Sequence, residues 1–325
     1  MNKKDFPRGI RSTSPTHTTI LIQDDSMRWL DKCEPATFHG IVTDPPYGVR
    51  EFEEEHLENL AEGDEVWQTF RYKDGANRAV QPCFSTLSVG ERKELEEYFQ
   101  DFGRRIARVL KPGAHAIIAG HVSLSNIVFP AIERGAILDG VPSLEFRGSI
   151  IRLVTTLRGG DRPPGYQKEF PDVCTLPRSR HEPWALFRKA MPAGMSVVEC
   201  LREHGTGALR RQPSTVKNPD GLPAMDVIAA NRPTKDERAI ANHPNLKPQS
   251  LMRELVYMAL PMGTGTILEP FTGSGSTLAA AAFHGLNCVG IEREDKFYDM
   301  AASAIPLLSQ SCPKIVSSEE PGIAF

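Results

Sequence analysis

The chain has 325 residues, of which 40% are hydrophobic and 24% are charged, and its formal net charge is −3. These proportions are ordinary for a globular protein and allow one large α/β domain with insertions or two smaller domains. The slightly negative charge argues against a protein that coats nucleic acid without specificity, but it is compatible with a local basic cleft.

Cysteines and histidines show no metal-binding pattern. The six cysteines form no CxxC pair, and the nine histidines have no HExxH or similar spacing. This argues against a zinc cage or a disulfide framework and favours a reducing, cytoplasmic location without a metal. The first 18 residues lack the apolar stretch of a signal peptide, and no run is long enough to span a bilayer. We therefore expect no membrane contact and interpret residues 1–18 as a mobile polar arm.

Predicted strands and helices alternate along the chain, which indicates a mostly parallel sheet. Strands are predicted over 18–25, 38–44, 114–120, 149–157, 183–189, 265–270 and 287–292. Helices are predicted over 91–113, 250–260 and 276–286, with Gly113 placed to end the first of them. Residues 49–90 open with an acidic run that is typical of a solvated helix face. Residues 190–242 are rich in Pro, Gly, Arg and Asn and are interpreted as a small recognition module or a connector.

The stretch TDPPYGVR (43–50) places two prolines behind an aspartate at the end of a predicted strand. Prolines lack an N–H donor and have a nearly fixed φ, and the residue before each is pushed toward extended conformations. The stretch is compatible with a rigid exit from the strand. It also suits a socket that fixes a carboxylate, a carbonyl and an aromatic ring around one substrate.

A second informative stretch is TILEPFTGSGSTLAAAA (266–282), in which a predicted strand enters a glycine turn followed by a helix. Gly273 and Gly275 permit close backbone approach, and the helix N-terminus offers free N–H groups. The next strand ends in Glu292, a position where an acidic residue commonly binds ribose hydroxyls. The spacing matches neither GxGxxG nor a phosphate loop ending in GK[ST]. The pattern therefore favours an adenosine without a phosphate chain.

Three motifs in one order carry a resemblance to a known family. DPPY (44–47), HPNLKP (243–248) and PFTGSG (270–275) resemble those of the amino-methyltransferases that modify exocyclic amines of DNA bases. The catalytic motif comes first and the glycine loop last, as in the circularly permuted β group, and the likeness extends to about Ile305. It implies a doubly wound, mostly parallel α/β sheet, the Rossmann-like fold of S-adenosylmethionine-dependent methyltransferases.

The resemblance also implies a division of the chain. Residues 19–189 would form the catalytic half of the methyltransferase domain, with an insertion at 49–90. Residues 190–242 would be a short target-recognition segment, 243–306 the cofactor-binding half, and 307–325 a flexible tail.

The cofactor residues implied by the resemblance are Asp25, Lys247, Ser250, Glu269, Phe271, Gly273, Gly275, Ser276, Thr277 and Glu292. Glu269 would face the methionine amino group of S-adenosylmethionine, and the loop from Phe271 to Gly275 would wrap the methionine part. Ser276 and Thr277 would begin the helix beneath that loop. Glu292 would hold the ribose hydroxyls.

The same resemblance places three further residues around the cofactor. Asp25 would contact the adenine amino group, and the preceding Asp24 stands where the family more often has glycine. Lys247 and Ser250 would close over the methionine end, although a lysine at a helix start is also an ordinary feature.

The catalytic residues implied are Asp44, Pro45, Pro46 and Tyr47. An exocyclic amine is a poor nucleophile because its lone pair is delocalised into the ring. The Asp44 carboxylate and the Pro45 carbonyl would accept its two N–H groups and aim the lone pair outward, with the geometry set before the substrate arrives. Tyr47 would stack on the base, and no metal would be needed because the sulfonium methyl is already activated.

Because a duplex hides the target amine, the base would have to be rotated out of the helix. Between Arg147 and Lys189 the chain has nine basic and four acidic residues. The basic residues could form a strip that faces the phosphates of DNA, or they could be scattered charges on the surface. The candidate DNA contacts are Arg158, Arg162, Lys168, Arg178, Arg180, Arg210 and Arg211.

The sequence leaves several substrates open. DPPY is more typical of adenine-N6 enzymes, whereas cytosine-N4 enzymes more often begin the motif with serine. An RNA base or a protein glutamine could also be the methyl acceptor, and the chain could be a non-catalytic module; glutamine enzymes usually have Asn at the position of Asp44. The expected partner is double-stranded DNA, with a homodimer and a specificity or restriction subunit as further candidates.

Overall fold

The computed structural model describes residues 8–46, 89–154, 172, 179–216 and 218–311. The strands are β1 (Gly9–Thr13), β2 (Thr18–Gln23), β3 (Phe38–Thr43), β4 (Leu110–Ala119), β5 (Ile137–Leu138), β6 (Val141–Pro142), β7 (Leu144–Leu153), β8 (His181–Lys189), β9 (Val227–Ala229), β10 (Thr266–Glu269) and β11 (Asn287–Glu292). The helices are α1 (Ser26–Lys32), α3 (Val89–Val109), α4 (Ser125–Gly135), α5 (Val197–His204), α6 (Lys235–Ile240), α7 (Gln249–Ala259), α8 (Ser276–Phe283) and α9 (Asp295–Gln310).

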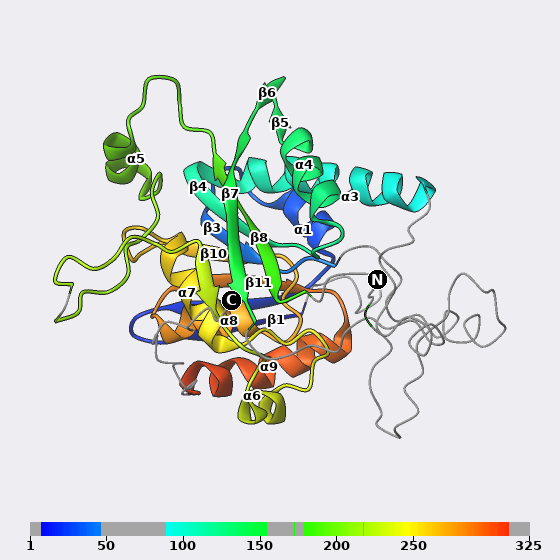
Figure 1. The fold of residues 1–325 in the computed structure, drawn as a ribbon, viewed down its shortest axis with the longest axis vertical. Helices are drawn as coiled ribbons and strands as arrows, with labels where there is room; N and C mark the ends of the chain where they lie inside the picture. Colours follow the sequence, from blue (N-terminus) through cyan, green and yellow to red (C-terminus); the bar gives the residue numbers. More distant parts are fainter. Residues whose placement is uncertain (1–7, 47–88, 155–171, 173–178, 217, 312–325) are drawn as a thin grey trace.

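A nine-stranded sheet in the order β1-β2-β11-β10-β3-β4-β8-β7-β9 forms the centre of the molecule (Figure 1). The five neighbours β2, β11, β10, β3 and β4 are parallel. Strands β1, β8 and β7 run antiparallel to the neighbours that join them to this group. The carboxyl ends of the five parallel strands therefore share one edge of the sheet, where ligands of open α/β sheets bind.

Helices cover both faces of the sheet, so the central strands are buried on both sides. In β3, Ile41 belongs to the core beneath α1, α3 and α4, whereas Val42 belongs to the core beneath α7, α8 and α9. Ile118 and Ile117 of β4 divide in the same way. Figure 1 shows the two groups of helices on opposite sides of the strands. The predicted doubly wound, mostly parallel α/β class is confirmed.

Helices α3 and α4 cross so closely that glycine is required at the contact. A Cβ atom built on Gly103 would lie 2.1 Å from the carbonyl oxygen of Ile132, and one built on Gly135 would lie 1.9 Å from that of Gln100. Both distances are far inside van der Waals contact. The two helices therefore meet backbone to backbone and cover the sheet as one layer.

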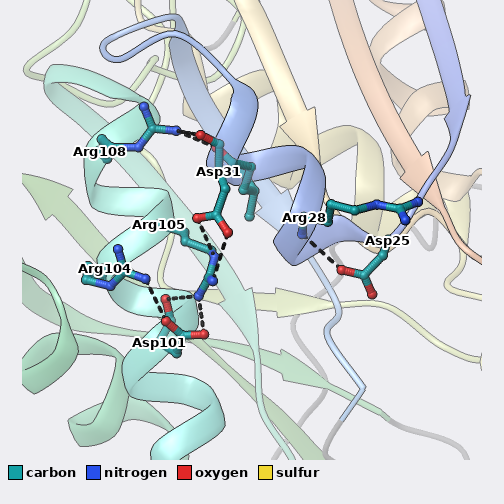
Figure 2. Close-up of polar contacts among 8 residues, drawn as sticks. Asp25, Arg28, Asp31, Asp101, Arg104, Arg105 and Arg108 are labelled. Atoms are coloured by element: carbon teal, nitrogen blue, oxygen red, sulfur yellow. Dashed lines mark hydrogen bonds and ion pairs between the residues drawn. The ribbon is translucent and has the colours of Figure 1, made fainter. Parts of the chain in front are cut away.

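Helix α1 is joined to α3 by a polar network (Figure 2). Arg105 donates to the Asp31 carboxylate at 3.0 Å and also pairs with Asp101, which accepts from Arg104 at 2.8 Å. Arg108 donates to the last carbonyls of α1, including that of Asp31 at 3.2 Å. Because α1 begins directly after β2, these contacts fix the position of the chain at one end of the ligand-binding edge.

Three predicted boundaries were wrong. Helix α3 ends at Val109, and Gly113 lies inside β4 with φ +73°, where an added Cβ would lie 2.5 Å from Cys200 Sγ. Residues 9–13, assigned to a mobile arm, form strand β1 because they pair with β2. Helix α9 continues to Gln310, past the expected start of a tail at residue 307. The predicted insertion at 49–90 lies outside the described residues except for 89–90, which begin α3.

In the described part of the chain, no helix combines the length and apolar character that crossing a membrane requires.

We expect Gly103→Ala to destabilise the protein, because the added methyl group meets a backbone carbonyl that cannot move aside. A clash as close as 2.1 Å belongs at the upper end of the overpacking cost, about 3 kcal/mol. This exceeds the gain of about 1 kcal/mol that alanine brings to a helix interior. Chemical denaturation would measure the change. Gly9→Ala is the control, since its Cβ would lie 3.7 Å from the nearest atom. Equal stability of the two variants would contradict the close crossing.

Candidate active site

Acidic residues follow four neighbouring parallel strands at one edge of the sheet. Asp24 and Asp25 come after β2, Glu292 ends β11, Glu269 ends β10, and Asp44 comes after β3. The sheet order places these strands side by side. The fold thus brings residues 44–46 and the stretch 269–277 to the ends of adjacent strands.

Glu269 organises the glycine loop from the inside. Its carboxyl group is 3% exposed and accepts hydrogen bonds from the Thr277 hydroxyl at 2.6 Å, from the Phe271 N–H at 3.0 Å and from the Thr43 hydroxyl. Burial raises the pKa of Glu269 to about 8, against the three donors, which lower it. The contact with Thr43 links the loop to the residue directly before Asp44.

The glycines of the loop adopt backbone conformations that other residues rarely take. Gly273 has φ +51°, and its N–H donates to the Glu292 carboxylate at 2.8 Å. Gly275 has φ +85° and precedes α8 as its N-cap, without a side-chain cap. A Cβ on Gly275 would lie 2.5 Å from Ile305 of α9. The turn therefore brings the backbone close to both Glu292 and α9.

The loop and its surroundings fit the methionine part of S-adenosylmethionine. The uncapped N-terminus of α8 is suited to a carboxylate, and Glu269 and Glu292 are suited to cationic or hydroxyl groups. The Oε1 atom of Gln249 is buried beside this helix start without a hydrogen-bond partner, while its Nε2 donates to the Ser276 carbonyl at 2.9 Å. A buried acceptor left without a donor is a natural site for a ligand N–H or O–H group.

The other end of the edge is formed by the start of α1 and by α3. Asp25 caps α1 by accepting from the Arg28 N–H at 3.0 Å (Figure 2). Burial and the nearby Asp25 carboxylate raise the pKa of Tyr98 to about 12. Ser26 donates to the carbonyl of Pro270, and the rings of Phe102 and Phe271 lie 5.4 Å apart. The half-buried ring of Phe271 therefore follows a residue that contacts the start of α1, and such a ring suits a flat adenine.

Asp24 has a partner of its own. It is 7% exposed and accepts from Arg28 Nε at 2.7 Å. Asp24 thus forms an ion pair with Arg28. A glycine, which the family more often has at position 24, could not form it.

Asp44 is joined to Lys247 by an ion pair of 2.9 Å between Nζ and Oδ2. Lys247 also pairs with Glu182 at 3.2 Å. Lys247 thus contacts the carboxylate of the DPPY motif, whereas the sequence prediction placed it over the cofactor. Of the two prolines that follow Asp44, Pro45 is buried and Pro46 is exposed. Tyr47 lies outside the described residues.

The segment before α7 also covers the glycine loop. The His243 ring lies 3.4 Å from the point where a Cβ of Gly273 would be, and 4.5 Å from the Phe297 ring between centroids. Burial, Lys247 and Lys296 lower the pKa of His243 to about 4. Ser250 is half-buried in the first turn of α7.

The family assignment follows from comparison with known proteins. The N6/N4 methyltransferase family, described as DNA methylase, matches residues 38–303. The chain belongs to this DNA methylase family. Its cofactor is accordingly S-adenosylmethionine, the methyl donor that the features of the glycine loop fit.

Individual relatives agree with this assignment. The type II methyltransferase M.HindIII of Haemophilus influenzae is 24% identical over 309 residues, which is 90% of this chain and 96% of the relative. The type II methyltransferase M2.LlaDCHI of Lactococcus lactis subsp. cremoris is 24% identical over 301 residues, with coverages of 90% and 92%.

Solved structures show the same fold. The PvuII DNA methyltransferase, a cytosine-N4-specific enzyme, superposes with a TM-score of 0.53 at 12% identity, over 94% of this chain and 92% of its own. The M1.HpyAVI–SAM complex gives 0.50 at 14% identity, with coverages of 88% and 98%.

Several residues that the sequence prediction missed lie at this edge. Glu182 and Trp184 are near the start of β8, and Arg152 is near the end of β7. Because β8 is antiparallel to β4, its first residues lie beside the carboxyl ends of the parallel strands. In the sequence, the only signal was a charged residue, Glu182, directly before the strand predicted over 183–189. It identifies a site residue only if the direction of that strand in the sheet is known.

Of the candidate DNA contacts, the structure describes Arg180, Arg210 and Arg211. Arg180 is exposed. The Arg210 guanidinium lies 4.1 Å from the centroid of the Tyr257 ring, and Arg211 donates to the carbonyls of Asp220 and Gly221. Arg158, Arg162, Lys168 and Arg178 lie outside the described residues.

The strip of basic residues between 147 and 189 is not uniformly accessible. Arg152 is 3% exposed, because it pairs with Glu182 inside the sheet edge. It is therefore unavailable to a phosphate.

The segment 190–242 is partly built into the main sheet. Its strand β9 pairs in parallel with β7, and Cys200 of α5 donates to the Pro112 carbonyl at 3.4 Å. The N-terminal residues of α6 hold the start of α7, since Glu237 accepts from the Gln249 N–H at 2.7 Å. Its function in target recognition stays a prediction.

We expect Glu269→Gln to remove a pH dependence of stability. Because burial raises the pKa of Glu269 from 4.5 to about 8, its protonated form contributes stability that is complete below about pH 4.5 and is lost as the pH rises through about 8. The free energy of unfolding of the wild type relative to Glu269→Gln would fall in that window by up to about 1.4 kcal/mol per pH unit. Denaturation at pH 5, 6.5, 8 and 9 would test this. A difference that does not change with pH would refute the raised pKa.

Proposed function

We propose that this DNA methyltransferase transfers the methyl group of S-adenosylmethionine to the exocyclic N6 of adenine, within a short DNA sequence. The observation that carries the proposal is the contact of Thr43 with Glu269, which joins the DPPY strand to the glycine loop. The carboxylate of Asp44 and the cofactor loop thus meet at adjacent strand ends. This is the arrangement that transfer between a cofactor methyl group and a base amine needs.

The cofactor would be held by residues from three strand ends. Glu269 would face the methionine ammonium, the loop from Phe271 to Gly275 would wrap the methionine part, and Glu292 would bind the ribose hydroxyls. Asp25 would bind the adenine amino group beside the ring of Phe271. The sulfonium supplies an activated methyl group.

The protein would contribute to the reaction by orienting the amine and by stabilising the charge that develops on its nitrogen. Asp44 and the Pro45 carbonyl accept the two N–H groups of the amine, so that the nitrogen lone pair is directed toward the methyl group. As the new bond forms, positive charge develops on the nitrogen, and the Asp44 carboxylate stabilises it. Proton loss to the carboxylate or to water completes the reaction.

Adenine is favoured over cytosine by the first residue of the motif. Asp44 matches the DPPY pattern that is more typical of the adenine-N6 members of the family, where cytosine-N4 members more often have serine. The base would leave the duplex at a cost of a few kcal/mol for unstacking. Arg180, Arg210 and Arg211 are the described candidates for phosphate contacts.

The test is to incubate the purified protein with methyl-labelled S-adenosylmethionine and unmethylated genomic DNA, then digest to nucleosides and identify the labelled one by mass spectrometry. We expect N6-methyladenine. Labelled N4-methylcytosine would refute the choice of base while leaving the mechanism in place, and absence of label from the DNA, with cofactor binding confirmed, would refute the DNA substrate.

We expect Asp44→Ala to reduce the labelled product by at least about 100-fold, because the amine loses its principal acceptor. Cofactor affinity, measured by calorimetry on the same preparation, should change little. Normal methylation by Asp44→Ala would show that another group orients the amine.

A further inference from the structure

Four side chains of alternating charge run along the carboxyl-end edge beyond β3. Asp44 pairs with Lys247 at 2.9 Å, Lys247 with Glu182 at 3.2 Å, and Glu182 with Arg152 at 3.1 Å. They come from the end of β3, the segment before α7, and the facing strands β8 and β7. The two acids and the two bases balance in charge.

Glu182 is the most firmly held member of this group. Its Oε1 accepts from Trp184 Nε1 at 3.0 Å, and Trp184 is completely buried in the core. Its Oε2 pairs with Arg152, which also donates to the carbonyls of Ala230 at 3.0 Å and Asn231 at 2.7 Å. Glu182 is thus anchored to the sheet core and to the segment after β9.

The group is shielded from solvent. The exposed fractions of the side chains are 4% for Arg152, 14% for Glu182, 16% for Lys247 and 21% for Asp44. Burial lowers the pKa of Lys247, but Asp44 and Glu182 raise it to a value above the ordinary one, so the side chain is an ammonium ion at neutral pH. Buried ion groups contribute little net stability, whereas removal of one member leaves a charge without compensation.

We propose that Glu182 is a positioning residue for methyl transfer, which holds the Lys247 ammonium against Oδ2 of Asp44 and offsets its charge at the reacting amine. This inference rests on the proposed function of Asp44. Lys247 fixes the orientation of the carboxylate, because an ion pair to one oxygen limits rotation of the group. Its positive charge alone would oppose the cation that develops on the amine nitrogen. The negative charge of Glu182 on the far side of Lys247 cancels that effect.

The test compares Glu182→Gln with Glu145→Gln in single-turnover methyl transfer at saturating cofactor and DNA. Glu145 pairs with Arg188 at 3.0 Å across the same two strands, at the other end of their ladder, and is the matched control. We expect Glu182→Gln to slow the transfer step by about 10-fold or more, since misplaced catalytic groups cost up to about 100-fold. The dissociation constant for S-adenosylmethionine should change by less than about 3-fold, because Glu182 acts on the carboxylate and not on the cofactor.

A double variant separates positioning from general structural damage. If Glu182 acts through Lys247, then Lys247→Met with Glu182→Gln should be no slower than Lys247→Met alone. Glu182→Asp, which keeps the charge, should recover part of the rate. Independent, multiplicative losses of rate in the double variant would overturn the proposal, as would a rate for Glu182→Gln equal to that of Glu145→Gln.

Two further results separate this inference from the proposed function. If Glu182→Gln does not fold, Trp184→Phe replaces it in the test, because this change removes one donor to Glu182 and retains the charges of Glu182 and Lys247. Trp184→Phe should slow methyl transfer when Lys247 is present and should have no effect in the Lys247→Met background. A large loss of cofactor affinity in Lys247→Met, with an unchanged transfer rate at saturation, would assign Lys247 to the cofactor and overturn the inference. Methyl transfer by the wild type with no effect of these variants would overturn the inference and leave the proposed function intact. Absence of transfer by the wild type to any nucleic acid would instead refute that function.

Discussion

The buried carboxyl group of Glu269 is the contact on which the site depends. Its three donors come from Thr43 at the end of β3, from Thr277 in α8 and from the backbone of Phe271. Thr43 and Glu269 are separated by 226 positions in the sequence, yet parallel pairing of β3 with β10 brings them to the same edge. One group with almost no access to bulk water thus holds together the strand that leads to Asp44, the glycine loop and the helix below it.

Glu269 and Asp44 lie on neighbouring strands but are held in different ways. Glu269 is surrounded by neutral donors, and burial raises its pKa to about 8, so a proton remains on it near neutral pH in the ligand-free protein. Asp44 instead forms an ion pair with the Lys247 ammonium. Separation of two carboxyl groups into a neutral and an ionic one is a common way to assign them different functions. In the ligand-free protein the neutral group suits the interior of the loop, and a bound ammonium group would favour its ionisation. The ionic group, Asp44, suits an acceptor of amine hydrogens.

Much of this architecture was predictable from local patterns. The alternation of strands and helices indicated the sheet, and the glycines at 273 and 275 indicated the loop. The resemblance carried by DPPY and PFTGSG, in that order, implied the cofactor. The predicted end of α3 at Gly113 was wrong because that glycine serves a close approach to Cys200, which is far along the chain, and not a helix end. Strand β1 was missed because its residues are all exposed and show no apolar alternation, so that only pairing with β2 identifies it.

The residues around Lys247 were not predictable for a related reason. Their positions depend on the direction of strands β7 and β8, which local sequence does not specify. In the antiparallel pair, the first residues of β8 and the last of β7 meet at the edge where β3 ends, so Glu182 and Arg152 come within reach of Lys247. Strand β9 then adds in parallel to β7 and brings the carbonyls of Ala230 and Asn231 to Arg152. The segment 190–242, which looked like a separate module in the sequence, is therefore linked through two ion pairs to the lysine beside Asp44. The sheet thus continues beyond its five parallel strands with β8, β7 and β9. These added strands support Asp44, where the substrate would bind, at the same edge of the sheet where the parallel strands support the glycine loop.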